Sequence, residues 1–421
     1  MLGLLYYVPR ASVMMGEKCG VTARLKSKFP LLIRWHCFNH RLELSVGDAV
    51  KCCSEINYFK AFMDTLYATY SMSPKAQREL AECASQVDVQ LLRIGRVLNV
   101  RWVASSCRTV KAVWESYLAL YTHFQQKSGD KPLDSNERAK FSGMASKLAN
   151  PSFIKNLGLI YDALEELADL SLALQKSNVN IFSANKLIAR QVELFVARKE
   201  GACEYYAEAC EGVKSGLFKG VMVTLSSAAA SRTGKVQDIN VGQFYQALAD
   251  SMSARLMPES DKDFCRAVDI LDKSNLPAEM SPEYGEAQVK LLCNKFGFSF
   301  SEIKTAFRTF KDTNGNVVPA VLKRLQNCIE TIPVSTASCE RGFSKMNIVS
   351  TALRTRLTIQ HMSSLMFISI NGPPLSMWQP LKYVKSWRAL NHRNATCTQG
   401  PSKMASSSIE EPSLQTLWKF M

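Results

Sequence analysis

The stretch TIPVSTASCERGFSKMNIVSTALRTRLTIQHMSSLMFISINGPP, residues 331–374, contains two helix patterns in succession. Pro333 ends an extended approach and Ser335 is a suitable N-cap, so a helix is predicted to begin near Thr336. Glu340 then falls in the early turns, where the helix dipole favours an acidic side chain. Apolar residues follow at three- and four-residue spacing and predict one apolar face: Phe343, Met346, Val349 and Leu353.

A second apolar helix is predicted over residues 361–370. Arg354 and Arg356 interrupt the first pattern, and the Asn-Gly-Pro-Pro sequence at 371–374 closes the second. Either an intramolecular core or a second chain can bury the two apolar faces. The further residues expected to contribute to such a contact are Leu357, Leu365, Met366 and Ile368.

Composition indicates a globular chain with a basic surface. The 421 residues allow two or three domains, and 47% hydrophobic with 21% charged residues is an ordinary globular balance. A formal net charge of +15 favours a polyanionic partner such as nucleic acid. The 13 cysteines are about 3% of the chain and follow no secretory signal, which indicates reduced thiols. No stretch approaches the roughly 20 apolar residues of a membrane helix, so we expect no membrane role.

Patterning along the chain divides it into four parts. Residues 1–125 look mixed, with short apolar runs at 4–8 and 31–37 that predict strands. Residues 126–300 have sparse strand signals and are expected to form an all-helical domain. Residues 301–374 form further helices that lead into the opening stretch. Residues 375–421 lose periodicity and gain Ser, Pro, Asn and Gln, which predicts a flexible tail.

Four short motifs occur upstream of and within the opening stretch, in a fixed order along residues 9–374. They are Arg10-Ala-Ser-Val-Met14 with Lys18-Cys-Gly-Val21, then Cys37-x-x-His40, then Arg101-Trp102, and finally Ser338-Cys-Glu-Arg341. Together with the two C-terminal helix patterns, this order resembles hAT-type DNA transposases, especially their domesticated vertebrate branch. The resemblance implies an α/β plus mainly α chain: a truncated ribonuclease-H-like core interrupted by a large helical insertion, predominantly helical overall, with a C-terminal dimerisation region.

The resemblance also bears on catalysis. Family members cut DNA with two aspartates and one glutamate that hold two magnesium ions. Glu340 matches the glutamate, whereas the second aspartate position is occupied by Pro9, beside Arg10, and the first would lie upstream of Met1. The family's N-terminal zinc finger is also missing. We therefore expect Glu340 to be vestigial, Mg²⁺ binding to be lost, no other cofactor or small-molecule substrate, and no enzymatic activity.

Two motifs have alternative interpretations. Cys37 and His40, with His36, could form half of a zinc site, but no second Cys/His pair at compatible spacing follows, so no metal is expected. The resemblance implies instead a structural role for this motif at a strand-to-helix corner. Trp102 is either a core residue or, as the resemblance implies, a base-stacking platform beside Arg101. Arg354 and Arg356 are expected at a solvated or phosphate-facing edge.

The resulting functional expectation is a non-catalytic, transposase-derived nuclear protein. It would dimerise with itself or with a related hAT-derived protein, and it would bind DNA or chromatin. Alternatives are a fragment of an active transposase, a relative that acts in SUMO transfer, or the unstable product of a decayed element.

Overall fold

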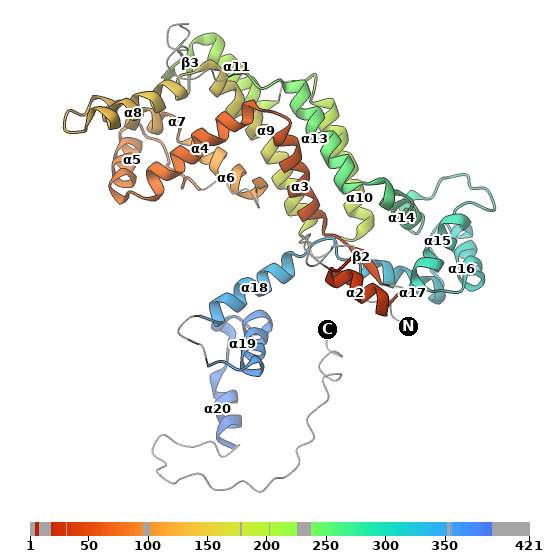
Figure 1. Ribbon diagram of the computed structural model, residues 1–421. Helices are drawn as coiled ribbons and strands as arrows, with labels where there is room; N and C mark the ends of the chain where they lie inside the picture. The colour runs from red at the N-terminus through yellow and green to blue at the C-terminus, as the bar shows by residue number, and fades with distance from the viewer. Residues whose placement is uncertain are drawn as a thin grey trace. The chain divides into compact units, whose positions relative to one another are not determined.

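The computed structural model describes residues 5–7, 18–30, 32–95, 102–176, 179–201, 203–224, 237–351, 354 and 356–389. Over these ranges the chain is predominantly helical, which confirms the coarse fold prediction (Figure 1). The chain divides into two compact units, Met1–Glu340 and Arg341–Met421. The division falls inside helix α18 (Ala337–Val349).

The first unit begins with a strand-helix-strand segment. Strand β1 (Leu5–Tyr7) pairs in parallel with β2 (Ile33–Trp35), and helix α2 (Val21–Lys28) lies between them in sequence. Parallel strands require a crossover connection of this kind, usually through a helix. The strands predicted at 4–8 and 31–37 are confirmed.

Helices make up most of the rest of the first unit, with one short hairpin of β3 (Leu217–Phe218) and β4 (Val221–Met222). Their bounds are α3 Phe38–Lys51, α4 Glu55–Ser71, α5 Pro74–Gln86, α6 Trp102–Glu115, α7 Tyr117–Gly129, α8 Ser135–Leu148, α9 Pro151–Leu174, α10 Ile181–Ala197, α11 Glu204–Ser215, α13 Val241–Leu256, α14 Glu259–Asp269, the 3-10 helix η1 Lys273–Asn275, α15 Glu286–Phe296, α16 Phe300–Asp312 and α17 Ala320–Glu330.

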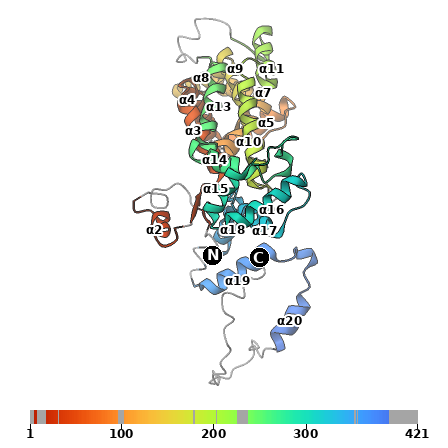
Figure 2. The same ribbon diagram turned by 90° about the vertical axis from the view of Figure 1, so that its right-hand side faces the viewer.

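Helix α9 lies at the centre of this unit. Asn150 caps its N-terminus by accepting a hydrogen bond from the Phe153 N–H at 3.2 Å, and Pro151 occupies the first turn. The helix packs against α6 and α11, while α13 packs against α3 and α10. Figures 1 and 2 show α3, α9, α10 and α13 running side by side. Fifteen of the 24 residues of α9 are buried, so this helix organises the core.

A buried carboxylate fixes α11 onto α9. The Asp162 side chain accepts hydrogen bonds from the backbone N–H groups of Tyr205 at 3.1 Å and Tyr206 at 2.8 Å, in the first turn of α11. Burial raises the pKa of Asp162, and the two backbone hydrogen bonds oppose that shift. The Tyr161 and Tyr205 rings stack with centroids 3.9 Å apart. The contact therefore combines a capped helix terminus with aromatic packing.

One continuous core runs through the first unit, from Ile33 to Val334. Helices α14, α15, α16 and α17 pack in succession and belong to the same core. The predicted division at 125/126 falls inside α7, and that at 300/301 falls at the start of α16. Helices from all three predicted regions contribute residues to this core.

The second unit contains the end of α18, helix α19 (Ile359–Asn371), the 3-10 helix η2 (Leu375–Met377) and helix α20 (Pro380–Ala389). The two helices predicted in the 331–374 stretch are confirmed, with starts within two residues of those expected. Helix α20 departs from the predicted loss of regular structure after 374; residues 390–421 lie outside the described ranges. None of the helices in those ranges is long and apolar enough to cross a membrane.

Candidate functional site

The Cys-x-x-His motif lies at a corner between β2 and α3, where the chain meets the segment before α18. Cys37 is the buried N-cap residue of α3, and the next backbone N–H, of Phe38, donates to the Val334 carbonyl at 3.1 Å. The Thr336 hydroxyl lies 3.6 Å from the Cys37 sulfur and 3.4 Å from the Glu340 carboxylate. The structure thus brings two of the sequence motifs together through a threonine.

Aromatic contacts hold this corner. Trp35 packs edge-on against Phe38 with ring centroids 5.5 Å apart, and the Arg41 guanidinium lies 5.1 Å from the centroid of the Trp35 ring. The His36 and His40 rings lie 4.8 Å apart. Because these side chains come from both sides of the strand-to-helix turn, they fix its direction.

Glu340 occupies the first turn of α18 and is exposed. Ser335 accepts a hydrogen bond from the Ala337 N–H at 3.1 Å, so it provides the expected cap. Pro9 and residues 10–14, where the resemblance places the second carboxylate strand, lie outside the described ranges. Within those ranges, no group of three or more His, Cys, Asp and Glu side chains is arranged to hold a metal ion.

The residues predicted to contact nucleic acid are only partly described. Arg101 lies outside the described residues, and Trp102 is the first residue of α6, described in its backbone alone. The adjacent Val103 N–H donates to the Glu43 carboxylate at 3.1 Å, so α3 caps the start of α6. This contact connects the Arg-Trp motif with the helix of the Cys-x-x-His motif. Arg354 and Arg356 belong to the second unit and are exposed.

The predicted dimerisation residues fall into three groups by exposure. Phe343 and Ile368 are exposed. Met346, Leu357, Leu365 and Met366 are half-buried. Val349 is buried, and Leu353 lies outside the described residues. Most of the predicted face therefore reaches the surface of this chain.

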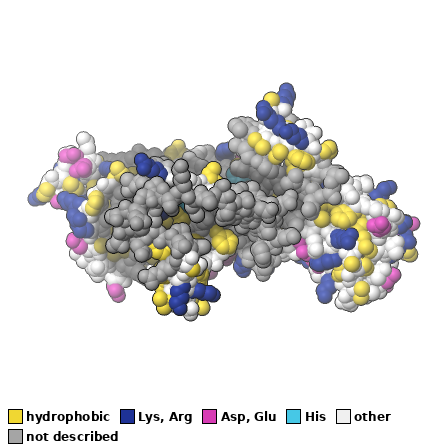
Figure 3. Space-filling view, turned by 90° about the horizontal axis from the view of Figure 1, so that it is seen from below, with side chains coloured by type: hydrophobic (Ala, Val, Ile, Leu, Met, Phe, Trp, Pro, Cys, Tyr) yellow, Lys and Arg dark blue, Asp and Glu magenta, His cyan; other side chains and the backbone are white. Residues whose placement is uncertain are grey.

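Sequence reasoning missed other exposed apolar side chains of the second unit. More than half of the large exposed hydrophobic residues in the described ranges lie between 343 and 387, and none of the α19 side chains is buried. Those absent from the prediction include Ile348, Phe367, Ile370, Trp378 and Trp387. On the face seen in Figure 3, hydrophobic side chains reach the surface next to Lys and Arg side chains.

The charged residues near these apolar side chains are of one sign, and this pattern could have identified the exposed surface from the sequence. Residues 341–389 include no Asp or Glu, whereas the segment contains Arg341, Lys345, Arg354, Arg356, Lys382, Lys385 and Arg388. Helix α19 has no Lys, Arg, Asp or Glu at all. A helix without a charged face is normally buried, so the exposure of α19 in the described chain is unusual.

Comparison with known proteins gives no match to any family model and no match to any solved structure. The function proposed for the chain is supported instead by the geometry of the described residues and by the order of the sequence motifs.

Proposed function

We propose that this chain is a non-catalytic protein derived from an hAT-type transposase, and that it associates with a second copy through residues 343–387, here named the apolar segment. The observation that carries the proposal is α19, an apolar helix without a charged side chain and without a buried residue. Soluble monomers rarely expose a helix of this composition, because apolar area in water is unfavourable.

The exposed area is large enough for a stable interface. The large exposed hydrophobic residues of the apolar segment are Phe343, Ile348, Ile359, Phe367, Ile368, Ile370, Leu375, Met377, Trp378, Leu381, Tyr383, Val384 and Trp387. With about half or more of each side chain in water, they present on the order of 1,000 Å². One side of a standard protein–protein interface buries about 800 Å². A second copy supplies an equal area in a two-fold symmetric contact.

The finer fold proposal is a partial ribonuclease-H-like core interrupted by a helical insertion. Two observations support it. The β1-α2-β2 segment is a parallel strand pair with a helical crossover, and α3 follows directly. The segment before α18 returns to this corner, where Val334 accepts the Phe38 N–H and Thr336 lies beside Cys37.

We further propose that Glu340 is a vestigial carboxylate. Two-metal cleavage needs several carboxylates around the ions, and the aligned second position in this sequence is Pro9, whose side chain cannot bind a metal. The full chain is therefore expected to leave a transposon-end duplex intact in Mg²⁺, in a nicking assay read on a denaturing gel. Nicking by the wild-type chain that disappears in Glu340→Gln would contradict this and identify an active transposase fragment.

Nuclear localisation and nucleic-acid binding complete the proposal. The net charge of +15 supports a polyanionic partner. The family resemblance implies such a contact for Arg101 and Trp102, and we propose that the basic edge of Arg354 and Arg356 adds to it. Phosphate contacts of this kind make affinity fall steeply with salt. Binding to a random-sequence duplex over a salt series tests this property independently of self-association.

Self-association is tested by light scattering after size-exclusion chromatography at micromolar concentration. Phe367→Asn combined with Ile368→Asn removes two exposed apolar side chains from α19 and is expected to weaken dimerisation at least about tenfold. Leu172→Asn is the matched control, because Leu172 is 61% exposed on α9, close to the 64% of Phe367. Both residues are exposed, so neither change is expected to unfold the chain.

The dependence of dimerisation on salt concentration gives a second test of self-association. A two-fold contact would bring together two copies of a segment that has basic residues and no acidic ones, so repulsion should oppose dimerisation at low ionic strength. Dimerisation is expected to strengthen as salt rises. A strictly monomeric wild-type chain at every salt concentration, or equal loss in the Leu172 control, would contradict the proposal.

A further inference from the structure

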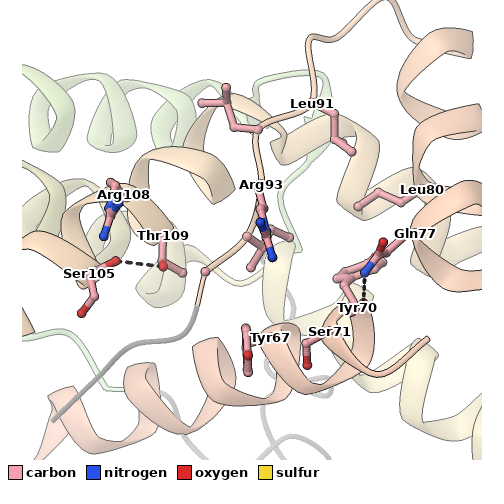
Figure 4. A pocket seen from close by; sticks show the side chains of 13 residues that line it. Tyr67, Tyr70, Ser71, Gln77, Leu80, Leu91, Arg93, Ser105, Arg108 and Thr109 are labelled. Carbon is pink, nitrogen blue, oxygen red and sulfur yellow. Dashed lines mark hydrogen bonds between the residues drawn. The ribbon is translucent and has the colours of Figure 1, made fainter. Parts of the chain in front are cut away.

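A pocket opens in the first unit between the end of α4, helix α5, helix α6 and the segment of residues 91–95. Its volume is about 810 Å³, within the range of small-molecule sites. Figure 4 shows segment 91–95 crossing one side of the pocket, with Tyr67 and Ser71 of α4 opposite. The self-association proposed for the second unit makes no use of this pocket.

The charged side chains described in the lining of the pocket are positive. Among the described residues that line it there are two arginines, the exposed Arg93 and Arg108, and no carboxylate. Arg93 extends from segment 91–95 into the space in Figure 4, and it has no hydrogen bond or ion pair to another described residue. Arg108 uses its Nε to bond the Ala104 carbonyl at 3.2 Å, which orients its guanidinium on α6. Two guanidinium groups without a carboxylate favour an anion, and phosphate accepts their paired hydrogen bonds well.

The rest of the lining is apolar or bears hydroxyl groups, except for Gln77, whose amide donates to the Tyr70 carbonyl at 2.7 Å. Tyr67, Leu80, Leu91 and Ile94 supply the apolar surface. An aromatic ring next to apolar side chains favours a flat ring system, because every base presents a π-face that can stack. A ligand that joins a phosphate to an aromatic ring therefore fits both halves of the lining.

Backbone contacts hold segment 91–95 in place. The Leu92 N–H donates to the Ser116 hydroxyl at 3.3 Å. At Gly95 a Cβ atom would lie 3.1 Å from the Thr109 hydroxyl, so the segment passes close to α6 at this point. The Thr109 hydroxyl in turn donates to the Ser105 carbonyl at 2.9 Å. The hydrogen bond at Leu92 and the close passage at Gly95 thus hold this wall on both sides of Arg93, whose exposed side chain extends from it.

We infer that this pocket binds a nucleotide, with the phosphate on Arg93 and Arg108 and the base against Tyr67 and its apolar neighbours. Two ligands carry a phosphate and a base in this way: a free mononucleotide, or one nucleotide within a single strand of nucleic acid. This binding goes beyond the proposed self-association, since neither arginine belongs to the apolar segment.

The test is calorimetric titration of the full chain with adenosine 5′-monophosphate, adenosine, inorganic phosphate and a deoxyadenosine strand of about twelve nucleotides. We expect the mononucleotide to bind more tightly than adenosine or phosphate alone. Arg93→Gln and Arg108→Gln should each weaken it roughly ten- to a hundredfold. Arg78→Gln is the matched control, because Arg78 is exposed on α5 but does not line the pocket.

A second pair of variants addresses the base. Tyr67→Leu should weaken mononucleotide binding about fivefold or more, and Tyr58→Leu, an exposed tyrosine on the same helix, should not. Thermal unfolding of each variant identifies any that is misfolded. A strand that binds far more tightly than the mononucleotide, and loses affinity in the arginine variants, identifies a single strand as the source; comparable affinities identify the free nucleotide.

Three results would overturn the assignment: no binding of either nucleotide probe at millimolar concentration, unchanged binding in Arg93→Gln combined with Arg108→Gln, or phosphate binding as tight as that of the mononucleotide. Light scattering on the same samples reports self-association separately. A monomeric chain that still binds the nucleotide would contradict the proposed function and leave the pocket assignment intact.

Discussion

Helices α9 and α19 are both rich in apolar residues, yet they have opposite environments. Of the 24 residues of α9, fifteen are buried, whereas none of the 13 residues of α19 is buried. Helix α9 also includes acidic side chains, whereas α19 has no Lys, Arg, Asp or Glu. The comparison shows that apolar character alone does not place a helix in a core. The available neighbours decide it.

The neighbours of α9 come from distant parts of the sequence. Helices α6 and α11 pack against it, and α3, α4 and α10 contribute further contacts. Within the second unit, α18, α19 and α20 do not pack along one another over their described residues. The free energy gained by burying apolar surface is thus realised for α9 within one chain. For α19 this free energy is not gained within the described chain, and that exposure is the basis of the self-association proposed above.

The same substitution in the two helices gives the largest expected contrast. Phe153 on α9 is 2% exposed and contacts the Phe59 and Phe62 rings, with centroids 5.7 and 4.8 Å away. Phe153→Ala should lower the free energy of unfolding by about 3–5 kcal/mol, because it leaves a cavity in the core. Phe367→Ala on α19 should change it by no more than about 0.5 kcal/mol in the monomer. Urea denaturation at low protein concentration measures both.

Protein concentration provides the control for this pair. If α19 is covered in a dimer, the cost of Phe367→Ala should grow as concentration rises, while that of Phe153→Ala should stay constant. A Phe367→Ala variant that is as unstable as Phe153→Ala at the lowest concentration would show that α19 is already buried in the monomer. That result would remove the contrast between the two helices.

Local patterns in the sequence predicted the local elements well. The N-cap at Ser335, the helices of the 331–374 stretch and the strands at 4–8 and 31–37 all follow from spacing and capping residues. The extent of the core did not follow from these patterns, because its buried residues run from Ile33 to Val334 and come from many separate helices. Periodicity within a window of a dozen residues says which face is apolar, but not which distant helix covers it.

The sequence likewise identified some residues of the candidate site but not the contacts that join them. The Cys37 motif and Glu340 were identified from motif order, whereas Thr336 was predicted only as the start of a helix and its contact with both motifs was missed. The contact between Glu43 and the start of α6 joins residues 60 positions apart and is likewise invisible to local spacing. Helix α20 was missed because it is short and follows a stretch rich in proline.

The close contact of α9 with α11 gives the next effect in size. A Cβ atom at Gly158 would lie 2.5 Å from the Tyr205 carbonyl oxygen, a backbone atom that cannot move aside alone. Gly158→Ala should therefore lower the free energy of unfolding by about 1–3 kcal/mol. Gly143→Ala in α8 is the matched control, because nothing lies within 4 Å of the Cβ position there.

The control should gain stability, since alanine has a better helix propensity than glycine by up to about 1 kcal/mol. Thermal unfolding of the two variants measures the difference. Equal stability of Gly158→Ala and the wild type would mean that α11 is not held closely on α9, and the packing described for this helix pair would then need revision.

A buried polar group on α7 provides the smallest effect and the one that depends on pH. His123 is buried, and its Nδ1 lies 2.8 Å from the Tyr70 hydroxyl. Its Nε2 lies 3.6 Å from the Glu79 carboxylate, which is paired with Lys127 at 2.7 Å. Burial lowers the pKa of His123 below its usual 6.5, and the nearby Glu79 opposes that shift only in part.

Because the folded-state pKa is the lower one, the unfolded chain takes up a proton at this histidine before the folded chain does. The free energy of unfolding should therefore fall as pH drops below about 7, and it should stop falling once the folded-state pKa is passed. Burial acts to raise the pKa of Glu79, but the hydrogen bonds to Lys127 and His123 together with the positive charges of Lys127 and Lys75 lower it on balance, so Glu79 loses its contribution only at more acidic pH.

Urea denaturation at several pH values between about 7.5 and 5.5 measures how much His123 contributes to the pH dependence of the free energy of unfolding. His123→Gln keeps a hydrogen-bonding side chain beside Tyr70 and should flatten the dependence on pH. His361→Gln on α19 is the matched control, because His361 is exposed and its replacement should leave the slope unchanged. An unchanged slope in His123→Gln would mean that this histidine titrates alike in both states, and the buried environment found for α9 and its neighbours would not extend to α7.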